Sequence, residues 1–312
     1  MTSMSTKTIL ITGATGKQGS AVIEQLLASP ESRGLTIFAI TRNVDSGSAK
    51  KLAAKSPDTI KLIQGDLDDC RAIFDNVKSS INSVFCVSVP YMGFGAKSEQ
   101  EEVQAKSLVE EAFVRGVEHF VFTSVDRHGP DSDAMDTDVP HFITKANIEK
   151  HILKRFDGPG RTWTILRPVA FMENIIPGFV GKVFPTAWQN NLSPTTKLQV
   201  VSTQDIGWFG AQALMKPAEY SGQAISLAGD DLTFQEANDI FRNAAGTDMP
   251  TTWGFLVSLM LWLNGDLGLM FRFFENTGYA ADIQSLRKRH PGLLSFSDWV
   301  KSSPFAKTKT EL

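Results

Sequence analysis

Short apolar runs alternate with longer segments of helical character through the first half of the chain. Each run is rich in β-branched and aromatic residues, a composition that favours strands. The runs lie at residues 8–12, 36–41, 60–64, 83–89, 119–123 and 162–167. Between two of them, Ala105, Leu108, Val109 and Ala112 recur at the spacing of one buried helix face. This alternation predicts an α/β fold, a doubly wound parallel sheet (Rossmann) whose ligand crevice lies beyond the carboxyl ends of the strands.

The pattern changes after residue 167. Residues 177–194 are rich in glycine and proline, and short strands and helices follow them. We therefore divide the chain into a Rossmann domain, residues 1–167, and a smaller C-terminal α+β lobe, residues 168–312, which contacts a substrate or a protein partner.

The most apolar part of the second lobe spans residues 253–274. Its first run, residues 253–263, has about half of the roughly 20 apolar residues that a spanning helix needs, and residues 264–266 interrupt it. We expect helices that pack as a cap and no membrane span; contact with a membrane surface is the alternative. The polar residues 1–7 run directly into the first strand, so we also expect no signal peptide.

The composition is that of an ordinary globular protein. With 31 basic and 34 acidic residues, the net charge is −3, which offers no electrostatic footprint for direct binding of nucleic acid. The two cysteines, Cys70 and Cys86, belong to no CxxC pair, so neither a disulfide framework nor a zinc ribbon is expected. We expect a cytoplasmic protein, with access to the nucleus if it acts as a regulator.

Other chemistries find little support in the sequence. The five histidines form no HxxxH pair and have no cysteine partner, so no metal site is expected. No GxSxG nucleophile elbow is present. The acidic clusters at residues 99–102 and 131–138 are expected to be solvated helix and loop surfaces.

A glycine-rich loop follows the first strand directly. It consists of Gly13, Ala14, Thr15, Gly16, Lys17, Gln18 and Gly19. Gly13 permits a tight turn, Gly16 lets the backbone approach a pyrophosphate, and Gly19 allows close packing of the helix on the strand. The free N–H groups of the following helix N-terminus favour an anion. The loop therefore predicts a dinucleotide site; a plain turn is the alternative.

The end of the second strand discriminates between the two nicotinamide dinucleotides. An acidic side chain there would bind the ribose 2′-hydroxyl of NAD and repel a 2′-phosphate, but this chain has Thr41, Arg42 and Asn43. A guanidinium binds a phosphate bidentately, so we predict NADP(H) as cofactor, with a solvated surface arginine as the alternative. Asp66 and Leu67, just past the third strand, lie where the adenine edge is expected, and Asp66 could equally cap the next helix.

Several segments, in order along the chain, resemble the NmrA-like family, whose members are atypical short-chain dehydrogenases/reductases. The resemblance covers nearly the whole chain. Its carriers are the glycine loop, Thr41-Arg42-Asn43, Gln64-Gly65-Asp66-Leu67-Asp68-Asp69, Lys145, Glu173-Asn174, and Met270-Phe271-Arg272-Phe273-Phe274 leading to His290-Pro291.

This resemblance implies an NADP(H) site built from several parts of the chain. The backbone from Gly13 to Gln18 would belong to it, with Arg42 and Asn43 at the 2′-phosphate and Asp66 and Leu67 near the adenine. The resemblance further implies, under the ribose, Ser88, Val89 and Pro90, and, near the nicotinamide, Lys145, Phe171, Met172, Glu173 and Asn174.

The catalytic residues of the superfamily are only partly present. Typical reductases place a tyrosine four residues before a lysine on one helix face, with a serine at the end of the fifth strand. Here Lys145 and Ser124 are present, but His141 occupies the tyrosine position. Histidine can donate a proton near neutral pH, so we predict these three residues as catalytic. The alternatives are a solvated lysine, a serine that terminates a strand and a histidine at a helix cap.

Two functions remain open for a chain of this kind. The first is an NADPH-dependent reductase of a small, largely apolar carbonyl, imine or quinone, which the intact glycine loop supports. The second is a non-catalytic redox sensor, in which exchange of NADPH for NADP+ reshapes loops at residues 125–140 and 168–194 and so regulates a protein partner such as a transcription factor. The missing tyrosine supports the sensor.

Overall fold

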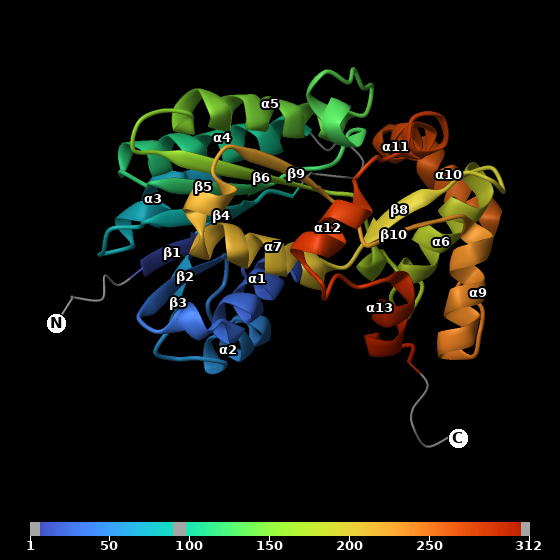
Figure 1. The fold of residues 1–312 in the computed structure, drawn as a ribbon, viewed down its shortest axis with the longest axis horizontal. Coiled ribbons are helices and arrows are strands. Elements are labelled where there is room, and N and C mark those ends of the chain that lie inside the picture. Colours follow the sequence, from blue (N-terminus) through green and yellow to red (C-terminus); the bar gives the residue numbers. More distant parts are fainter. Residues whose placement is uncertain (1–6, 90–97, 307–312) are drawn as a thin grey trace.

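The computed structural model describes residues 7–89 and 98–306. Its centre is a seven-stranded parallel sheet in the order β3-β2-β1-β4-β5-β6-β9, with helices on both faces (Figure 1). The strands of this sheet are β1 (Lys7–Ile11), β2 (Leu35–Thr41), β3 (Ile60–Gln64), β4 (Ser83–Val87), β5 (His119–Thr123), β6 (Thr162–Pro168) and β9 (Gln223–Leu227). The predicted doubly wound fold and all six predicted strands are confirmed, with strand ends shifted by no more than two residues.

Each face of the sheet carries its own apolar core. One face is covered by α1 (Lys17–Ala28), α2 (Gly47–Ala54) and α7 (Thr203–Met215), and the other by α3 (Cys70–Asp75), α4 (Ser98–Val114) and α5 (Pro140–Phe156). The helix face predicted from Ala105, Leu108, Val109 and Ala112 is fully buried on α4, as the spacing predicts.

After forming part of a second, smaller sheet, the chain returns to the large sheet with α7 and β9. Helix α7 packs against α1 so closely that a Cβ on Gly207 would lie 2.7 Å from the Cβ of Ala21. Strand β9 then pairs with β6 in register Thr164 to Gln223 and completes the sheet. The boundary after residue 167 remains a prediction, and the structure adds that α7 and β9, from beyond it, belong to the sheet and its covering layer.

The remaining C-terminal residues form a second layer beside the carboxyl ends of the strands (Figure 1). Its sheet has the order β10-β8-β7, from β7 (Ala170–Phe171), β8 (Leu198–Val201) and β10 (Asp230–Leu232). Its helices are α6 (Val180–Asn191), α9 (Phe234–Ala245), α10 (Gly254–Leu263), α11 (Gly265–Asn276) and α13 (Phe296–Ser302). Two further short helices, α8 (Pro217–Tyr220) and α12 (Ile283–Arg289), pack instead in the core of the large sheet. Single 3-10 turns occur at η1 (Pro30–Ser32), η2 (Leu67–Asp69), η3 (Gly129–Asp133) and η4 (Met172–Asn174).

The lobe has an aromatic core of its own, to which the large domain contributes. Trp188, Phe241, Phe274 and Phe296 are buried in it, and Phe142 at the start of α5 packs edge-to-face on Phe273. The start of α5 is therefore buried under the second lobe, which brings its residues into contact with α11.

The most apolar region of the chain forms two helices, as predicted. Helices α10 and α11 meet at Asn264 with a bend of 109°. Within the described residues no single helix has the length and apolarity to cross a membrane, whereas this bent pair meets that criterion by length and composition alone.

Candidate functional site

The glycine loop connects the carboxyl end of β1 to the start of α1. Gly13 has φ +57°, a conformation that favours glycine, and a Cβ on Gly19 would lie 2.3 Å from the Gly13 carbonyl oxygen. Only glycine at residue 19 lets α1 begin this close to the strand. The predicted strand, turn and helix are all present, as a dinucleotide-binding loop requires.

The first turn of α1 is open to an anion. Gly16 is its N-cap residue, and no side chain in the described part of the chain accepts a hydrogen bond from the N–H groups that begin the helix. A Cβ on Gly16 would approach only the Gly13 carbonyl oxygen, at 3.2 Å. Because uncapped N–H donors and the positive end of the helix dipole lie here together, the loop fits a pyrophosphate.

Two side chains of the loop tie it to other predicted parts of the site. The Lys17 ammonium donates to the Glu173 carbonyl oxygen at 2.6 Å, and the Gln18 side-chain oxygen accepts from the Thr123 hydroxyl at 2.6 Å. The loop, the end of β5 and the turn η4 are therefore neighbours at the carboxyl ends of the strands.

The predicted 2′-phosphate residues lie just past the end of β2. Arg42 and Asn43 are both exposed, and Asn43 turns its side-chain oxygen back to accept from the Asp45 N–H at 2.8 Å. Among the residues described, none forms an ion pair with the Arg42 guanidinium, so this charge is available to a ligand. Past β3, Asp66 accepts from the Asp68 N–H at 3.1 Å.

Asp66 therefore caps η2, one of the two roles that the sequence left open for it. Its carboxylate is exposed, and Leu67 beside it is half-buried against the core under α4. A capping carboxylate retains lone pairs, so the cap does not conflict with the predicted adenine contact.

The residues expected under the ribose follow β4. Ser88 is buried, Val89 is exposed, and Pro90 lies outside the described residues. The Ser88 hydroxyl donates to the Glu101 carboxylate at 2.7 Å.

Lys145 is the centre of a buried polar cluster at the ends of β4 and β5. Its ammonium lies 2.7 Å from the Glu101 carboxylate and 2.8 Å from the Ser88 hydroxyl. It also donates to the carbonyl oxygens of Ser88, at 3.1 Å, and Thr123, at 3.4 Å. The Thr144 hydroxyl donates to the second oxygen of Glu101 at 3.2 Å. Lys145 is therefore an ordered, buried cation and not the solvated lysine that was the alternative.

Glu101 contradicts the expectation that residues 99–102 are a solvated surface. Its side chain is fully buried, whereas Glu99 and Gln100 are exposed. Burial is tolerated because Lys145, Ser88 and Thr144 satisfy its carboxylate. The missed signal is positional: Glu101 lies one helical turn before Ala105, on the same buried face of α4.

His141 connects the large domain to the second lobe. It is buried at the start of α5, and its Nδ1 lies 2.5 Å from the Asp266 carboxylate in the first turn of α11. A carboxylate only accepts hydrogen bonds, so this contact orients the imidazole with its Nδ1–H towards Asp266. No local pattern identifies Asp266, because it is 125 residues away in the sequence.

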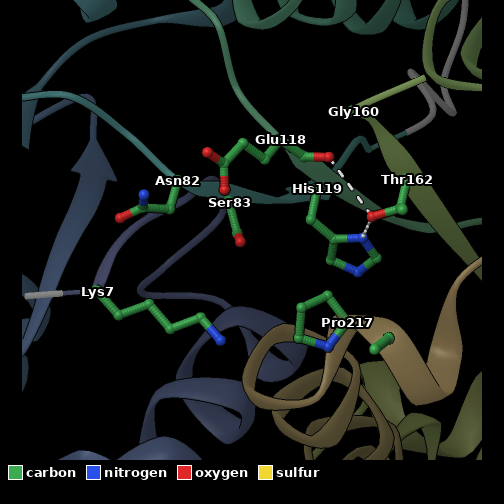
Figure 2. Close-up of a pocket in the computed structure, with 9 residues that line it drawn as sticks. Lys7, Asn82, Ser83, Glu118, His119, Gly160, Thr162 and Pro217 are labelled. Atoms are coloured by element: carbon green, nitrogen blue, oxygen red, sulfur yellow. Dashed lines mark hydrogen bonds between the residues drawn. The ribbon is translucent and has the colours of Figure 1, made fainter. Parts of the chain in front are cut away.

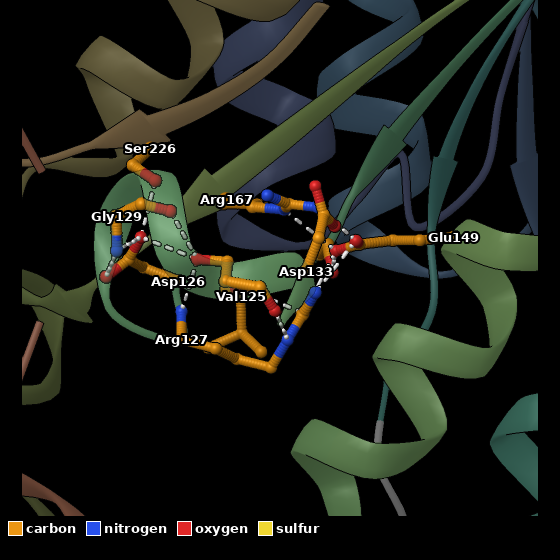
Figure 3. A network of polar contacts seen from close by, with 10 residues as sticks. Val125, Asp126, Arg127, Gly129, Asp133, Glu149, Arg167 and Ser226 are labelled. Carbon is orange, nitrogen blue, oxygen red and sulfur yellow. Dashed lines mark hydrogen bonds and ion pairs between the residues drawn. The ribbon is translucent and has the colours of Figure 1, made fainter. Parts of the chain in front are cut away.

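Ser124 is held by α5 one helical turn beyond Lys145. Its hydroxyl donates to the buried carboxylate of Glu149, which also binds the guanidinium groups of Arg127, at 2.8 Å, and Arg167 (Figure 3). Burial by itself would raise the pKa of Glu149, but these two arginines outweigh it and hold the pKa below its usual range. The catalytic role of Ser124 stays a prediction, because proton donation would first require it to leave Glu149.

The loop after β5 is fixed to the second lobe by a buried carboxylate, Asp126. It accepts from the backbone N–H of Gly129 at 2.9 Å and of Ala280 at 3.1 Å, and from the Ser226 hydroxyl (Figure 3). His128 in this loop has φ +90°, a strained conformation for a side chain of this type. The acidic residues that follow, such as Asp131 and Asp138, are exposed as expected.

The turn η4 is tied to α7 by Glu173. Its carboxylate accepts from the Thr203 N–H at 3.0 Å, the Ser202 hydroxyl at 2.9 Å and the Trp299 indole at 3.1 Å. Phe171 is half-buried, Met172 is buried and Asn174 is exposed. The side chain of Glu173 thus has a structural role, whereas its backbone faces the glycine loop through Lys17.

A cavity lies at the opposite end of the strands. It has a volume of about 540 Å³ and is lined by residues at the amino ends of the strands, including Lys7, Ser83, His119 and Thr162 (Figure 2). Burial, and secondarily the charge of Lys7, lowers the pKa of His119 from 6.5 to about 4. The glycine loop is at the carboxyl ends, so we do not assign this cavity to the dinucleotide. No cluster of metal-ligating side chains occurs within residues 7–89 and 98–306.

Comparison with known proteins identifies relatives over nearly the whole length of the chain. Residues 5–295 match the model of the NmrA-like family. An NmrA-like family domain-containing protein of Dictyostelium discoideum is 23% identical over 95% of this chain and 97% of its own. An NmrA-like family domain-containing oxidoreductase of Aspergillus flavus is 22% identical over 97% of this chain and 99% of its own.

Solved structures with the same fold include both enzymes and a regulator. Triphenylmethane reductase of Citrobacter sp., complexed with NADP(H), has a TM-score of 0.71 at 18% identity over 95% of this chain and 99% of its own. The quinone oxidoreductase QOR2 of Escherichia coli, complexed with NADPH, has a TM-score of 0.66 at 20% identity over 94% of this chain and 99% of its own. The negative transcriptional regulator NmrA, in complex with NADP, has a TM-score of 0.67 at 16% identity over 95% of this chain and 94% of its own.

Proposed function

Because the chain belongs to the NmrA-like family, we propose that it binds NADP(H) and reduces a small, largely apolar carbonyl, imine or quinone. The observation that carries the reductase function is the pair formed by His141 and Asp266 one helical turn before the buried Lys145. This arrangement presents an oriented imidazole and an ammonium on one face of α5, where the superfamily has its tyrosine and lysine.

The residues at the carboxyl ends of the strands suit each part of the dinucleotide. The open first turn of α1 would hold the pyrophosphate, and the exposed guanidinium of Arg42 would hold the 2′-phosphate. The ammonium of Lys145, beside Ser88 at the end of β4, would bind a ribose hydroxyl by giving up one of its present acceptors. The reductase and the quinone oxidoreductase with this fold are described with NADP(H) or NADPH, which supports the same cofactor here.

The proposed reaction consumes one hydride and one proton. Bound NADPH supplies the hydride to the carbon of a carbonyl or imine, or to a quinone. Protonated His141 donates the proton to the resulting oxygen or nitrogen anion, and Asp266 stabilises the imidazolium before the transfer. The products are the alcohol, amine or hydroquinone and NADP+. Lys145 contributes positive charge near the developing anion.

A redox sensor is the second candidate function. The buried Asp126 joins the loop after β5 to Ala280 in the second lobe, so a change at the nicotinamide end could reach the lobe through this loop. The regulator NmrA has the same fold and binds NADP, which supports this alternative. In it, the bound nucleotide would control a protein partner and no substrate would be reduced.

One assay separates the two functions. Purified protein is mixed with NADPH and a panel of carbonyls, imines and quinones, and the loss of nicotinamide absorbance is followed. The reductase function predicts a rate above the enzyme-free control that His141→Phe strongly reduces. A wild-type rate equal to the control across the panel, with NADPH binding intact, would favour the sensor.

A further inference from the structure

Helix α10 exposes an apolar surface instead of burying it. Only Val257 and Leu261 of this helix are buried in the core of the second lobe. The large apolar side chains exposed on α10 and at its N-cap are Trp253, Phe255, Leu259, Met260, Trp262 and Leu263. A helix at the surface of a globular protein normally shows polar residues on its outer side. Here the outer side is the apolar one.

The exposed surface has no charge and is not confined to one stripe. Residues 254–263 include no acidic or basic side chain, and Ser258 is their only hydroxyl. Leu259, Met260, Trp262 and Leu263 are all exposed, so the apolar surface covers the broad side of the helix that faces away from Val257 and Leu261. A protein partner typically covers one side of a helix and surrounds its apolar centre with a polar rim. A solvent that is itself apolar contacts such a helix on several sides at once.

Aromatic rings stand at both ends of this surface. Trp253 is 70% exposed before the first residue of α10, and Trp262 is 78% exposed near the last. The rings of Trp253 and Phe255 stack with centroids 6.3 Å apart, which makes one apolar plate. Tryptophan is the side chain most characteristic of the boundary between lipid headgroups and acyl chains.

We propose that α10 lies in the surface of a lipid bilayer, with its axis along the membrane and its exposed apolar side chains among the upper acyl chains. Because of the bend of 109° at Asn264, α10 and α11 do not form one straight segment that could cross the bilayer. The occupant of this surface is the lipid itself and not an anionic headgroup, because α10 offers no basic residue to attract one.

The position of the surface gives it a role in the proposed reaction. The next helix, α11, begins two residues after α10 ends, and its first turn carries Asp266, the partner of His141. A substrate dissolved in the bilayer would therefore approach near the proposed proton donor. Delivery of substrate from the bilayer rests on the proposed reductase function. The substrate class that such delivery favours is a lipid-soluble quinone or carbonyl.

Vesicle binding tests the membrane contact without any turnover. Full-length protein is floated with phosphatidylcholine vesicles at low and high salt, without nucleotide. We expect wild-type protein to bind at both salt concentrations, and Phe255→Ser/Trp262→Ser to partition at least about tenfold more weakly. Val103→Ser/Val114→Ser is the matched control, because these two side chains are equally exposed but lie on α4. Circular dichroism checks that each variant is folded.

Several results would overturn the proposal. One is the absence of wild-type binding to phosphatidylcholine, and another is equal binding by the α10 variant. A third is a dimer that the α10 substitutions dissociate, because the surface would then belong to a second copy. If the α10 variant does not fold, wild-type tryptophan fluorescence decides with vesicles of brominated phosphatidylcholine: quenching supports insertion, and unchanged fluorescence contradicts it.

A substrate pair separates this proposal from the proposed function. NADPH oxidation is measured with a decyl-tailed benzoquinone in the vesicles and with its tail-less analogue in solution. The α10 substitutions should slow reduction of the first and leave the second unchanged. Equal loss with both would contradict delivery through the membrane. No turnover of either would contradict the reductase function, while the vesicle-binding result would stand.

Discussion

Lys145 and Glu101 form a buried ion pair, 2.7 Å from nitrogen to oxygen, that joins α5 to α4 beside the glycine loop. Both side chains are more than nine-tenths buried. Removing one partner of such a pair leaves an uncompensated charge in the interior, whereas removing both does not. The pair therefore has consequences for stability that are separate from its proposed contact with a nucleotide.

Glu101→Gln should destabilise the folded chain by about 3 kcal/mol, because Lys145 loses its counter-charge in the interior. Urea unfolding measures the change. Glu99→Gln, on an exposed position of the same helix, is the control and should stay within about 0.5 kcal/mol of wild type. The double variant Glu101→Gln/Lys145→Met should recover part of the loss; a purely additive loss would show that the two residues are not coupled.

Arg42→Glu should weaken NADPH binding at least about tenfold and NADH binding much less, since it replaces attraction of the 2′-phosphate by repulsion. Fluorescence titration with both nucleotides gives the two dissociation constants. Arg33→Glu, an exposed arginine before β2, is the matched charge change and should affect both equally little. An equal loss for both nucleotides in Arg42→Glu would assign the arginine a structural role.

Gly16→Val should abolish nucleotide binding and leave a folded protein, because the side chain would occupy the open turn where the pyrophosphate fits. Gly19→Val should instead disturb the fold, since its Cβ would collide with the Gly13 carbonyl. Gly47→Ala, which has open space around it, is the control. Circular dichroism and titration measure both properties. Unchanged affinity in Gly16→Val would remove the basis for placing the pyrophosphate here.

His141→Phe should reduce kcat about a hundredfold at constant NADPH affinity, because it removes the proposed proton donor but keeps an aromatic ring at this position. Asp266→Asn should have a smaller effect in the same direction, since it leaves the imidazole but removes its counter-charge. Steady-state kinetics and nucleotide titration together test this. Full activity of His141→Phe would exclude the histidine as donor and leave Ser124, water or the substrate itself.

Stability should fall as the pH is lowered from about 6.5 towards 4. The folded pKa of His119 lies at about 4, below its ordinary value of 6.5, so the unfolded chain binds a proton within this range and the folded chain does not. A shift of this size corresponds to roughly 3 kcal/mol. Urea unfolding as a function of pH should show a flatter dependence in His119→Gln. The same slope in variant and wild type would assign the pH dependence to other groups.

The glycine loop and six strands could be predicted because their signals are local. Apolar runs, the spacing of Gly13, Gly16 and Gly19, and the residues after β2 all depend on neighbours in the sequence. Strand β9 was missed because more than 50 residues separate it from β6 in the sequence and it is recognisable as part of the sheet only through its pairing with β6.

The partners of the predicted catalytic residues depend on tertiary contacts. Asp266 reaches His141 only because α11 folds over the start of α5, and no spacing along the chain shows this. Glu101 is different, since the periodicity of Ala105 and Leu108 extends back to it. Its charge led to the wrong expectation of a solvated surface, although its position on α4 indicated burial.

The late arrival of β9 has a consequence for synthesis of the chain. Strand β6 is complete at Pro168, but its outer edge has no partner until Leu227 has been made. During that interval a nascent chain would present a row of unpaired backbone N–H and C=O groups on the ribosome. Translation of the intervening segment is thus a period of vulnerability to aggregation, and it ends only when β9 docks and closes that edge.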